Sequence, residues 1–569
     1  MVKLLPQWFR PALLAVAAIA LFAPFTREVS DFDFWWTLKS GHYIAEAHRL
    51  PVPDPFAFTT PLAHDTYSGE SVVRRFNLTF EWLAQLIFFG VYRVGGFAGM
   101  VFFRALLLAS CCALTGLIAW RRTHGFYLGL GAAFAAAGVL AIYSASDRSF
   151  LFTFFFLAAT LAILEFRKWL WLLPAIAFIW ANSHGGFFLQ WIAVGAYCVE
   201  AAWMRYRGRP RFTSATPERT LWIVLAACVL ASAVNPNGYR VLEVLHYFRT
   251  SFLQSKLLEW RAPVLWPLTA FSALLFAAAS VLLWARKRVR PADWLLFTTF
   301  AAAALMAQRN TFLIALWAPV ILVSYIPWKR SLPAIAHYAA AAALAALCAL
   351  GIARGAAFQF RAADWRFPVG AADFLLSHRV ATPMFNTYEL GGYLMWRVWP
   401  QERVFIDGRA LSESVFNDYA RILYNHSNAD GGPTAQDLLD RYGIQTIVMN
   451  GFEYAEGIAY NLMLSLSGNQ TKWKLVYNDP QAVVFMLDPP PGVEPLPGSA
   501  VFDHLEAECA LHIERDPNLT LCARALGQIF TRTRDTVRAR KWLGFYLSMP
   551  HVPDPEAEQA YASLLNPRR

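Results

Sequence analysis

The stretch FYLGLGAAFAAAGVLAIY, residues 126–143, decides the fold class of this chain. It contains no charged side chain and has no amphipathic periodicity. A soluble fold would have to bury such a segment on every side, whereas about 17–25 apolar residues span the core of a bilayer. Similar runs occur at 11–25 and 332–353. The sequence therefore predicts a polytopic α-helical membrane protein.

The composition of the whole chain supports this class. Of its 569 residues, 57% are hydrophobic and 16% are charged, whereas a typical soluble domain has about 25% charged residues. These values exclude a soluble enzyme, a disordered protein and a disulfide scaffold. We expect eleven membrane spans, at about 11–25, 97–120, 126–143, 150–166, 169–183, 186–203, 220–235, 265–285, 292–307, 311–327 and 333–353.

The short loops between these spans alternate between basic loops and loops with few charges. The basic group comprises Lys3, Arg10, Arg121–Arg122, Arg167–Lys168, residues 205–211, residues 286–290 and Lys329–Arg330. The positive-inside rule places all of these residues on the cytoplasmic side. They account for most of the net charge of +11, so we expect no nucleic-acid partner. The N-terminus is then cytoplasmic and the C-terminal third is extracytoplasmic.

This topology depends on residues 81–97, EWLAQLIFFGVYRVGGF. The segment is short and is interrupted by Arg93 and two glycines, so we expect a helix on the outer membrane surface rather than a further span. If the segment crossed the membrane, every later loop would change sides. The first apolar run could also be a cleaved signal peptide, and its removal would leave the later topology unchanged.

The chain divides into a membrane module and regions outside the membrane. Residues 1–353 form the module, which includes a first outer loop with surface helices at 26–96 and a second outer loop at 236–264. Residues 354–500 predict an extracytoplasmic α/β domain, and residues 501–569 predict a short helical tail.

Within the α/β domain, RVFIDGR at 403–409 and IQTIVMN at 444–450 are typical of buried strands. Residues 474–487 predict a hairpin, because Asn-Asp-Pro stands between two apolar runs. The tail contains Cys509 and Cys522, which could form a disulfide if this region is extracytoplasmic. The five other cysteines lie in apolar runs, where we expect them to act as small hydrophobic residues.

Polar residues next to the bilayer gather at the outer face in this topology. They are Asp31, Asp33, Arg148, Asn182, His184, Asn235, Glu259 and Arg309. Ionisable groups at membrane depth are costly and mark functional sites by default. We expect the outer loops to bring these residues into one site.

Each residue type suggests a particular role in such a site. In an extended segment, Asp31 and Asp33 would point the same way, so they could hold a divalent cation through oxygen ligands, or one could act as a general base. The guanidinium groups of Arg148 and Arg309 suit the clamping of a phosphate. The alternatives are solvated loop acids for the aspartates and interface anchors for the arginines.

His184, Asn182 and Asn235 have structural alternatives as well. His184 is followed by two glycines, which permit a close backbone approach to a ligand, but it could equally be a hydrogen-bonded structural histidine. The Asn-Pro-Asn-Gly sequence that begins at Asn235 is an ordinary turn signal.

The layout resembles the GT-C superfamily of membrane glycosyltransferases, and more closely a broad group of bacterial polytopic membrane proteins related to it. The strings that carry this resemblance are DFDFWWTLKSGHYI (31–44), LPVPDPFAFTT (50–60), EWLAQLIFF (81–89), WANSHGGF (180–187), NPNGY (235–239), NTYELGGYLMW (386–396) and VFIDGRALSESVFNDY (404–419). No motif of the PPL or WWDYG type is present.

The resemblance implies a specific activity and location. The chain would move a sugar from a polyprenyl-phosphate donor to an acceptor on the outer side of a bacterial cytoplasmic (inner) membrane. Asp33, or Asp31, would be the catalytic acid–base or a ligand of Mg²⁺ or Mn²⁺. Arg148 or Arg309 would hold the donor phosphate. Membrane lipids and the lipid-linked sugar are the partners that it implies.

Two functions from other classes remain open. A non-catalytic scaffold of envelope-polysaccharide assembly could keep the fold and bind partners through the surface around 404–409. In that region, Asp407 and Arg409 are most simply a structural pair near a strand end. A transporter is the second alternative, but transporters place polar residues near the middle of the bilayer and often contain paired repeats. We find no such repeat in the sequence.

Overall fold

The computed structural model describes residues 9–208, 218–248, 251, 258–328, 334–378, 380–427, 431–454, 456–468 and 470–565. The predicted cytoplasmic residues Lys3, Arg209, Arg211, Lys329 and Arg330 lie outside these ranges. The chain forms two compact units rather than the three parts predicted from the sequence. The first unit is Met1–Val52 with Tyr67–Ala362, and the second is Pro53–Thr66 with Ala363–Arg569.

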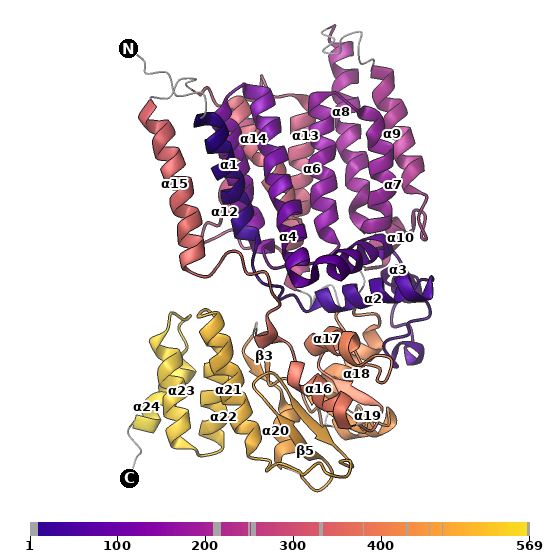
Figure 1. Cartoon of the computed structure of the whole chain (residues 1–569), viewed down its shortest axis with the longest axis vertical. Coiled ribbons are helices and arrows are strands. Elements are labelled where there is room, and N and C mark those ends of the chain that lie inside the picture. Colours follow the sequence, from indigo (N-terminus) through magenta and orange to yellow (C-terminus); the bar gives the residue numbers. More distant parts are fainter. Residues whose placement is uncertain are drawn as a thin grey trace. The chain divides into compact units, whose positions relative to one another are not determined.

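The first unit is a bundle of apolar helices with shorter helices at one end (Figure 1). Its helices are α1 (Phe9–Phe22), α2 (Asp33–Ala47), α3 (Glu70–Asn77), α4 (Trp82–Thr123), α5 (Phe126–Leu140), α6 (Phe150–Phe166), α7 (Leu173–Ser183), α8 (Phe188–Tyr206), α9 (Glu218–Ser232), α10 (Arg240–Phe248), α12 (Ala270–Trp284), α13 (Pro291–Met306), α14 (Phe312–Tyr325) and α15 (Ala334–Ala353). The helix α4 packs against α5 and α6. The helix α14 is buried along most of its length.

A helix lies at each of the eleven ranges predicted to span the membrane. Among the described residues, three helical segments are long and apolar enough to cross a membrane, namely Glu70–Thr123, Phe126–Tyr143 and Gly185–Tyr206. Shorter apolar helices of 10–17 residues include Phe150–Phe166 and Phe312–Tyr325. The first unit is therefore mostly helical and apolar, and the number of crossings stays a prediction.

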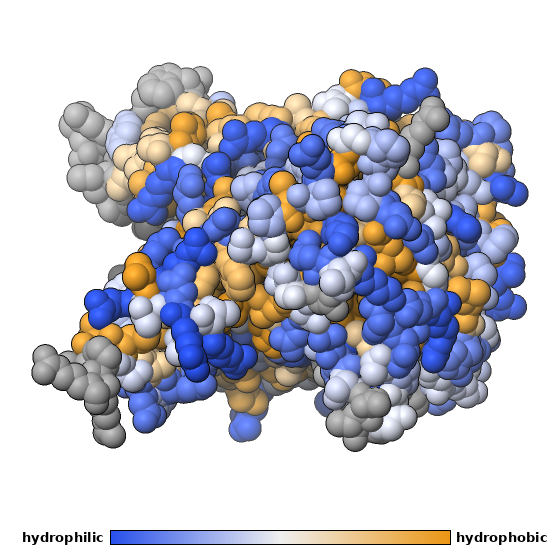
Figure 2. Space-filling model, turned by 90° about the horizontal axis from the view of Figure 1, so that it is seen from below, coloured by the Kyte–Doolittle hydropathy of each residue, from blue (hydrophilic) through white to orange (hydrophobic). Residues whose placement is uncertain are grey.

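Large apolar side chains are exposed on the helices of this unit. Examples are Trp222 on α9 and Trp284 on α12, which are 45% and 60% exposed. Exposed apolar surface of this kind is typical of membrane contact. By contrast, Figure 2 shows one face of the molecule on which hydrophilic residues predominate, with smaller hydrophobic areas between them.

Gly96 interrupts α4. Its backbone (φ 56°, ψ −149°) lies in a region that is essentially restricted to glycine. The residue divides the helix into 82–95 and 97–123, at the boundary predicted between a surface helix and a span. Figure 1 shows the first part lying across the end of the bundle, and α2 packs against α4.

The second unit contains a four-stranded mixed sheet in the order β1-β2-β6-β5. Its strands are β1 (Met384–Asn386), β2 (Thr446–Met449), β5 (Lys474–Asn478) and β6 (Val483–Met486). The β1–β2 pair is parallel, and β6 is antiparallel to both β2 and β5. The predicted strand at 444–450 and the predicted hairpin at 474–487 are thus confirmed. A second, two-stranded sheet pairs β3 (Phe452–Glu453) with β4 (Ile458–Ala459).

The prediction of a strand at 403–409 is wrong. In this segment, Val404 makes a single isolated parallel bridge with Ala57. Ala57 belongs to the segment Pro53–Thr66, which we call the strap. The strap is part of the predicted first outer loop in the sequence, but it folds with the second unit. The hydroxyl of Thr59 donates a hydrogen bond of 2.5 Å to the carbonyl of Phe405. The apolar run 404–406 is therefore buried under the strap without joining the sheet.

Arg409 connects the strap to this segment. Its Nη1 and Nη2 donate to the two carboxylate oxygens of Asp54 at 3.0 and 3.1 Å, and Nη2 also donates to Asp407 at 2.6 Å. The side chains of all three residues are buried. The predicted structural pair of Asp407 and Arg409 is confirmed, and Asp54 is a third member that the sequence did not reveal.

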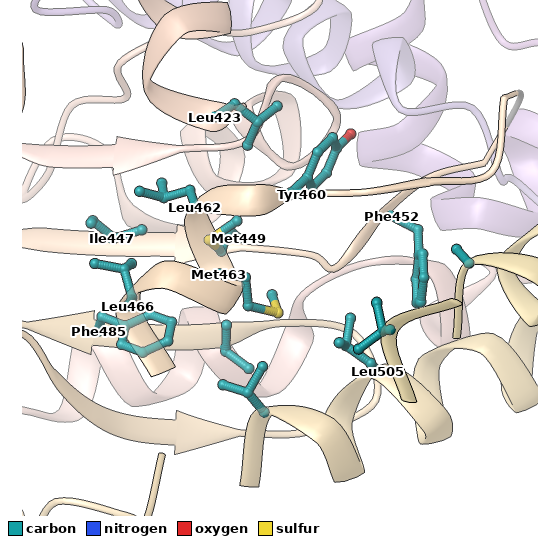
Figure 3. Packing of buried hydrophobic residues seen from close by; sticks show 14 of the residues in the cluster. Leu423, Ile447, Met449, Phe452, Tyr460, Leu462, Met463, Leu466, Phe485 and Leu505 are labelled. Carbon is teal, nitrogen blue, oxygen red and sulfur yellow. The ribbon is translucent and has the colours of Figure 1, made fainter. Parts of the chain in front are cut away.

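The helices of the second unit are α16 (Val369–His378), α17 (Tyr388–Val398), α18 (Glu413–Leu423), α19 (Ala435–Arg441), α20 (Asn461–Gly468), α21 (Ala500–Arg515), α22 (Leu521–Arg532), α23 (Thr536–Ser548) and α24 (Pro555–Leu565). The helical tail shares one hydrophobic core with the sheet. Figure 3 shows Met463 of α20 lying between sheet residues and Leu505 of α21. A disulfide joins Cys509 and Cys522, the pair considered from the sequence.

Candidate functional site

Arg148 is the centre of an ion network in the first unit. Its Nε and Nη2 donate to the two carboxylate oxygens of Asp31 at 2.7 and 3.0 Å. Its Nη1 lies 2.9 Å from an oxygen of Asp33 and 3.2 Å from an oxygen of Glu259. One guanidinium group therefore contacts three carboxylates, which come from two loops that are far apart in the sequence.

Glu259 connects this network to a second guanidinium group. While one of its oxygens faces Arg148, the other accepts a hydrogen bond of 3.0 Å from Nη1 of Arg309. The guanidinium of Arg309 also lies over the ring of Trp260, 4.6 Å from its centroid. The carboxylate of Glu259 thus bridges Arg148 and Arg309, which is the position that a bound phosphate could take.

Helix ends and short turns present these five side chains. Asp33 is the first residue of α2, and its backbone N–H donates to the carboxylate of Asp31 at 3.0 Å. Arg148 directly precedes the turn into α6, while Glu259 and Arg309 stand in short 3₁₀ turns. The extended segment expected for the aspartates is not found. Asp31 instead lies just before the start of α2 and Asp33 is its first residue, and both carboxylates contact Arg148.

Among the three carboxylates and two guanidinium groups of this network, Asp33 has a carboxyl group with a raised pKa. Burial raises the pKa of Asp33 to about 7, although the nearby Arg148 cation lowers it and the Asp31 carboxylate raises it further. Both oxygens of Asp31 accept hydrogen bonds from Arg148. A pKa of about 7 lets the carboxyl group of Asp33 take up and release a proton near neutral pH.

Glu81 is a buried acid beside the network that the sequence analysis missed. Its side chain accepts a hydrogen bond from the hydroxyl of Ser149, the residue after Arg148. Burial raises the pKa of Glu81 to about 7, while the hydrogen bond from Ser149 lowers it. A signal for Glu81 in the sequence is its place directly before the apolar helix that begins at Trp82.

His184 has a structural environment. Its Nδ1 accepts a hydrogen bond of 3.1 Å from the backbone N–H of Gly186 and lies 2.8 Å from the hydroxyl of Thr153. That hydroxyl in turn accepts from the indole of Trp180 at 2.8 Å. Burial lowers the pKa of His184 to about 3, so the ring is neutral at physiological pH.

The polar atoms of the two asparagines also serve local structure. Asn182 accepts from the indole of Trp82 and donates to the carbonyls of Phe178 and Val234. Asn235 bonds within its own turn, to Ser232, Asn237 and Gly238. These contacts explain both residues without a ligand, so we leave them and His184 out of the proposed site.

The carboxylates do not fit a resident Mg²⁺ or Mn²⁺ ion. Such ions need several oxygen ligands arranged around one point, but here the guanidinium of Arg148 stands where Asp31, Asp33 and Glu259 converge. Among the described residues, no group of three or more His, Cys, Asp or Glu is arranged to hold a metal ion. We derive no reaction step through a metal.

A second buried ion network lies at the opposite ends of the same helices. Arg122 of α4 pairs with Glu165 of α6 and Asp293 of α13 at 2.7 and 2.9 Å. Arg290 pairs with Glu165 and with Glu200 of α8. The 17 residues of α6, at about 1.5 Å each, place the two networks about 25 Å apart.

This second network corrects the expectation that polar residues at the bilayer gather only at the outer face. It also shows that Arg122 and Arg290, which the loop pattern assigns to the cytoplasmic side, are paired with buried acids. The sequence could not reveal these pairs, because each acid is isolated within an apolar run.

Comparison with known proteins gives the fold. No protein-family model matches the sequence, and no curated protein matches it. The archaeal oligosaccharyltransferase AglB from Archaeoglobus fulgidus, solved with an inhibitory peptide and a dolichol-phosphate, has a similar structure, with a TM-score of 0.50 and 12% identity. The match covers 85% of this chain and 74% of AglB. The apo form of the Archaeoglobus fulgidus oligosaccharyltransferase gives a TM-score of 0.45 and 12% identity over 85% of this chain and 75% of that one.

At 12% identity, the similarity to AglB shows a common fold alone. The chain therefore shares the fold of the oligosaccharyltransferase AglB.

Proposed function

We propose that the chain is a membrane glycosyltransferase that moves a sugar from a polyprenyl-phosphate donor to an acceptor on the outer side of a bacterial inner membrane. The observation that carries this proposal is the network in which Arg148 and Arg309 share a carboxylate beside Asp33. The similar AglB structure contains a dolichol-phosphate, which supports a lipid-phosphate donor for this chain too.

Arg148 and Arg309 would bind the donor phosphate. A phosphate replaces the carboxylate of Glu259 between the two guanidinium groups, because both anions accept hydrogen bonds from the same fork of N–H donors. When the bond between the sugar and the phosphate oxygen breaks, its electron pair stays on the phosphate. The two fixed cations stabilise the negative charge that develops there.

Asp33 would act as the general base. The hydroxyl oxygen of the acceptor attacks the anomeric carbon of the sugar, and the proton of that hydroxyl passes to the Asp33 carboxylate. A base whose pKa lies near the working pH is well suited to this role, as the pKa of about 7 for Asp33 allows. Asp31 would hold Arg148 in place through its two hydrogen bonds.

The scaffold alternative is less favoured, because the segment around Arg409 is not an open surface. Asp407 and Arg409 are buried and bonded to each other, and Arg409 is bonded to Asp54. Residues held in this way stabilise the second unit and are not available to a partner protein. No observation specifically favours a transporter.

The test is donor turnover by the full chain in nanodiscs. The probe is undecaprenyl-phosphate hexose, presented in a panel of sugars and assayed for loss of the sugar to water or to added glycan acceptors. We expect Asp33→Asn to abolish turnover while the variant inserts and accumulates normally. The matched control is Asp293→Asn, which alters a buried aspartate bonded to an arginine in the distant network and should keep activity. Full activity in Asp33→Asn would refute the role of Asp33.

A further inference from the structure

Arg104 of α4 is a buried cation that the proposed reaction does not use. Its side chain is 1% exposed and its partner Asp147 is fully buried. The Nη1 group of Arg104 pairs with the carboxylate of Asp147. Its Nε donates to the carbonyl of Phe25 at 3.2 Å, and its Nη2 donates to the carbonyl of Arg27. All the nitrogen atoms of one guanidinium group therefore have partners.

These partners lie on two of the segments that carry the first ion network, namely those of Asp31 and Arg148. The carbonyls of Phe25 and Arg27 belong to the stretch that leads into Asp31. Asp147 directly precedes Arg148. Since a guanidinium presents its N–H groups in a rigid planar fork, the positions of these two segments relative to each other are fixed through Arg104.

The loop that carries Arg148 is also held on its other side. There, the hydroxyl of Ser149 donates to the buried carboxyl of Glu81. Asp147 and Ser149, the residues on either side of Arg148, are therefore each bound to a buried side chain, Asp147 to Arg104 and Ser149 to Glu81. A buried ion pair contributes little net stability compared with apolar packing, so stability alone explains the Arg104–Asp147 pair poorly.

We propose that Arg104 is a positioning residue, which holds the Asp31 segment and the Arg148 loop in the register that lets Arg148 bind Asp31 and Asp33. The consequence for catalysis rests on the proposed function. The geometric consequence does not, because the contacts of Arg148 are observable without any substrate.

The variant that tests this proposal is Arg104→Lys in the full chain. Lysine keeps a positive charge for Asp147, but its single ammonium group lacks the planar fork that reaches two carbonyls at once. We expect kcat for undecaprenyl-phosphate hexose to fall about 100-fold, as for a misplacement of about 1 Å. Asp147→Asn, which keeps the side-chain shape, should change kcat in the same direction.

Arg122→Lys is the matched control. Arg122 lies on the same helix, and its side chain is also buried and paired with two acids. This variant should lose as much thermal stability as Arg104→Lys, yet its kcat should stay at the wild-type value. Equal effects of the two substitutions on kcat would overturn the proposal, because Arg104 would then be only a structural residue.

Density maps of the variants in nanodiscs distinguish this proposal from the proposed function. In Arg104→Lys we expect Arg148 to lose its paired contacts with Asp31, whereas Arg122→Lys should keep them. If the wild-type protein turns over no donor but the maps show this difference, the proposed function fails and the positioning role stands. If Arg148 keeps both contacts in Arg104→Lys, the positioning role is refuted, whatever the activity.

Discussion

Asp33 is the residue whose ionisation should control the rate. It faces Arg148, Asp31, Glu259 and Glu81, and its pKa is raised to about 7 mainly by burial. A general base acts only when deprotonated. We therefore expect kcat/KM for donor turnover to rise as the pH increases through about 7 and to level off above it, measured by a pH profile between about 5 and 9 in steps of roughly half a unit.

Glu81 provides the control for this profile, because its pKa also lies at about 7. Glu81→Gln keeps an acceptor for Ser149 and removes the titration. The acidic limb should persist in this variant if Asp33 is the base. Loss of the limb in Glu81→Gln would assign the titration to Glu81 and contradict our assignment.

Glu259 should compete with the donor phosphate. Because its carboxylate bridges Arg148 and Arg309, Glu259→Gln removes an internal anion from the proposed phosphate position. We expect undecaprenyl phosphate to bind about tenfold more tightly, since a charged hydrogen bond is worth roughly 1.5–3 kcal/mol and about 1.4 kcal/mol is a factor of ten. Native mass spectrometry of the protein with this lipid gives the affinity. Glu243 of the same outer loop supplies the control, and weaker binding in Glu259→Gln than in Glu243→Gln would refute the competition.

Residue chemistry made part of the site predictable. Acids and arginines that interrupt apolar sequence at one face of the membrane identified Asp31, Asp33, Arg148, Glu259 and Arg309. The roles of Glu81 and Arg104 were not predictable, because their partners Ser149 and Asp147 lie 68 and 43 residues away. Only the packing of the helices decides which of these groups meet.

At the scale of elements, helices could be predicted far better than strands. Runs of about 15–20 apolar residues specify a helix locally, since the backbone must satisfy its own hydrogen bonds in lipid. The segment 403–409 has the composition of a buried strand, but its neighbour is the strap at 53–66 rather than another strand. Its conformation depends on a distant segment, so its own sequence could not decide it.

Gly96 offers a test of the element that separates the surface helix from the span. A Cβ at this position would meet no neighbouring atom within 4 Å, but the backbone has φ +56°. Gly96→Ala should therefore destabilise the protein by about 1–3 kcal/mol through backbone strain alone. Thermal unfolding of the full chain in detergent measures this change.

Gly95 is the matched control for that substitution. A Cβ at Gly95 would also meet no neighbouring atom within 4 Å, and the backbone φ of Gly95 is not positive. Gly95→Ala should therefore be neutral or slightly stabilising. Equal destabilisation by both variants would show that the kink at Gly96 does not exist in the membrane-embedded protein.

At the scale of the whole molecule, one segment that precedes most of the first unit in the sequence folds with the second unit. The strap belongs to the first outer loop in sequence and to the second unit in structure. The strings LPVPDPFAFTT and VFIDGR are both distinctive in the sequence, but nothing in it shows that one packs on the other. The predicted division between an α/β domain at 354–500 and a tail at 501–569 differs from the structure, because the tail shares one hydrophobic core with the sheet.

The strap should be required for the stability of the second unit. Asp54→Asn leaves the buried Arg409 with only one carboxylate partner, Asp407. Removing one member of a buried ion network is strongly destabilising, and we expect a loss of about 3 kcal/mol. Limited proteolysis of the full chain during urea unfolding reports on this unit. Asp440→Asn, which breaks an exposed pair with Lys472, should cost less than about 1 kcal/mol, and a similar small effect of Asp54→Asn would contradict the role of the strap.

The central claim is that Arg148 and Arg309 form the binding site for a lipid phosphate. The most direct measurement is a density map of the full chain in nanodiscs that contain undecaprenyl phosphate. We predict the phosphate between the two guanidinium groups, with Glu259 displaced from at least one of them and Asp33 beside the headgroup. A lipid phosphate bound elsewhere, with Glu259 still bridging Arg148 and Arg309, would contradict the account.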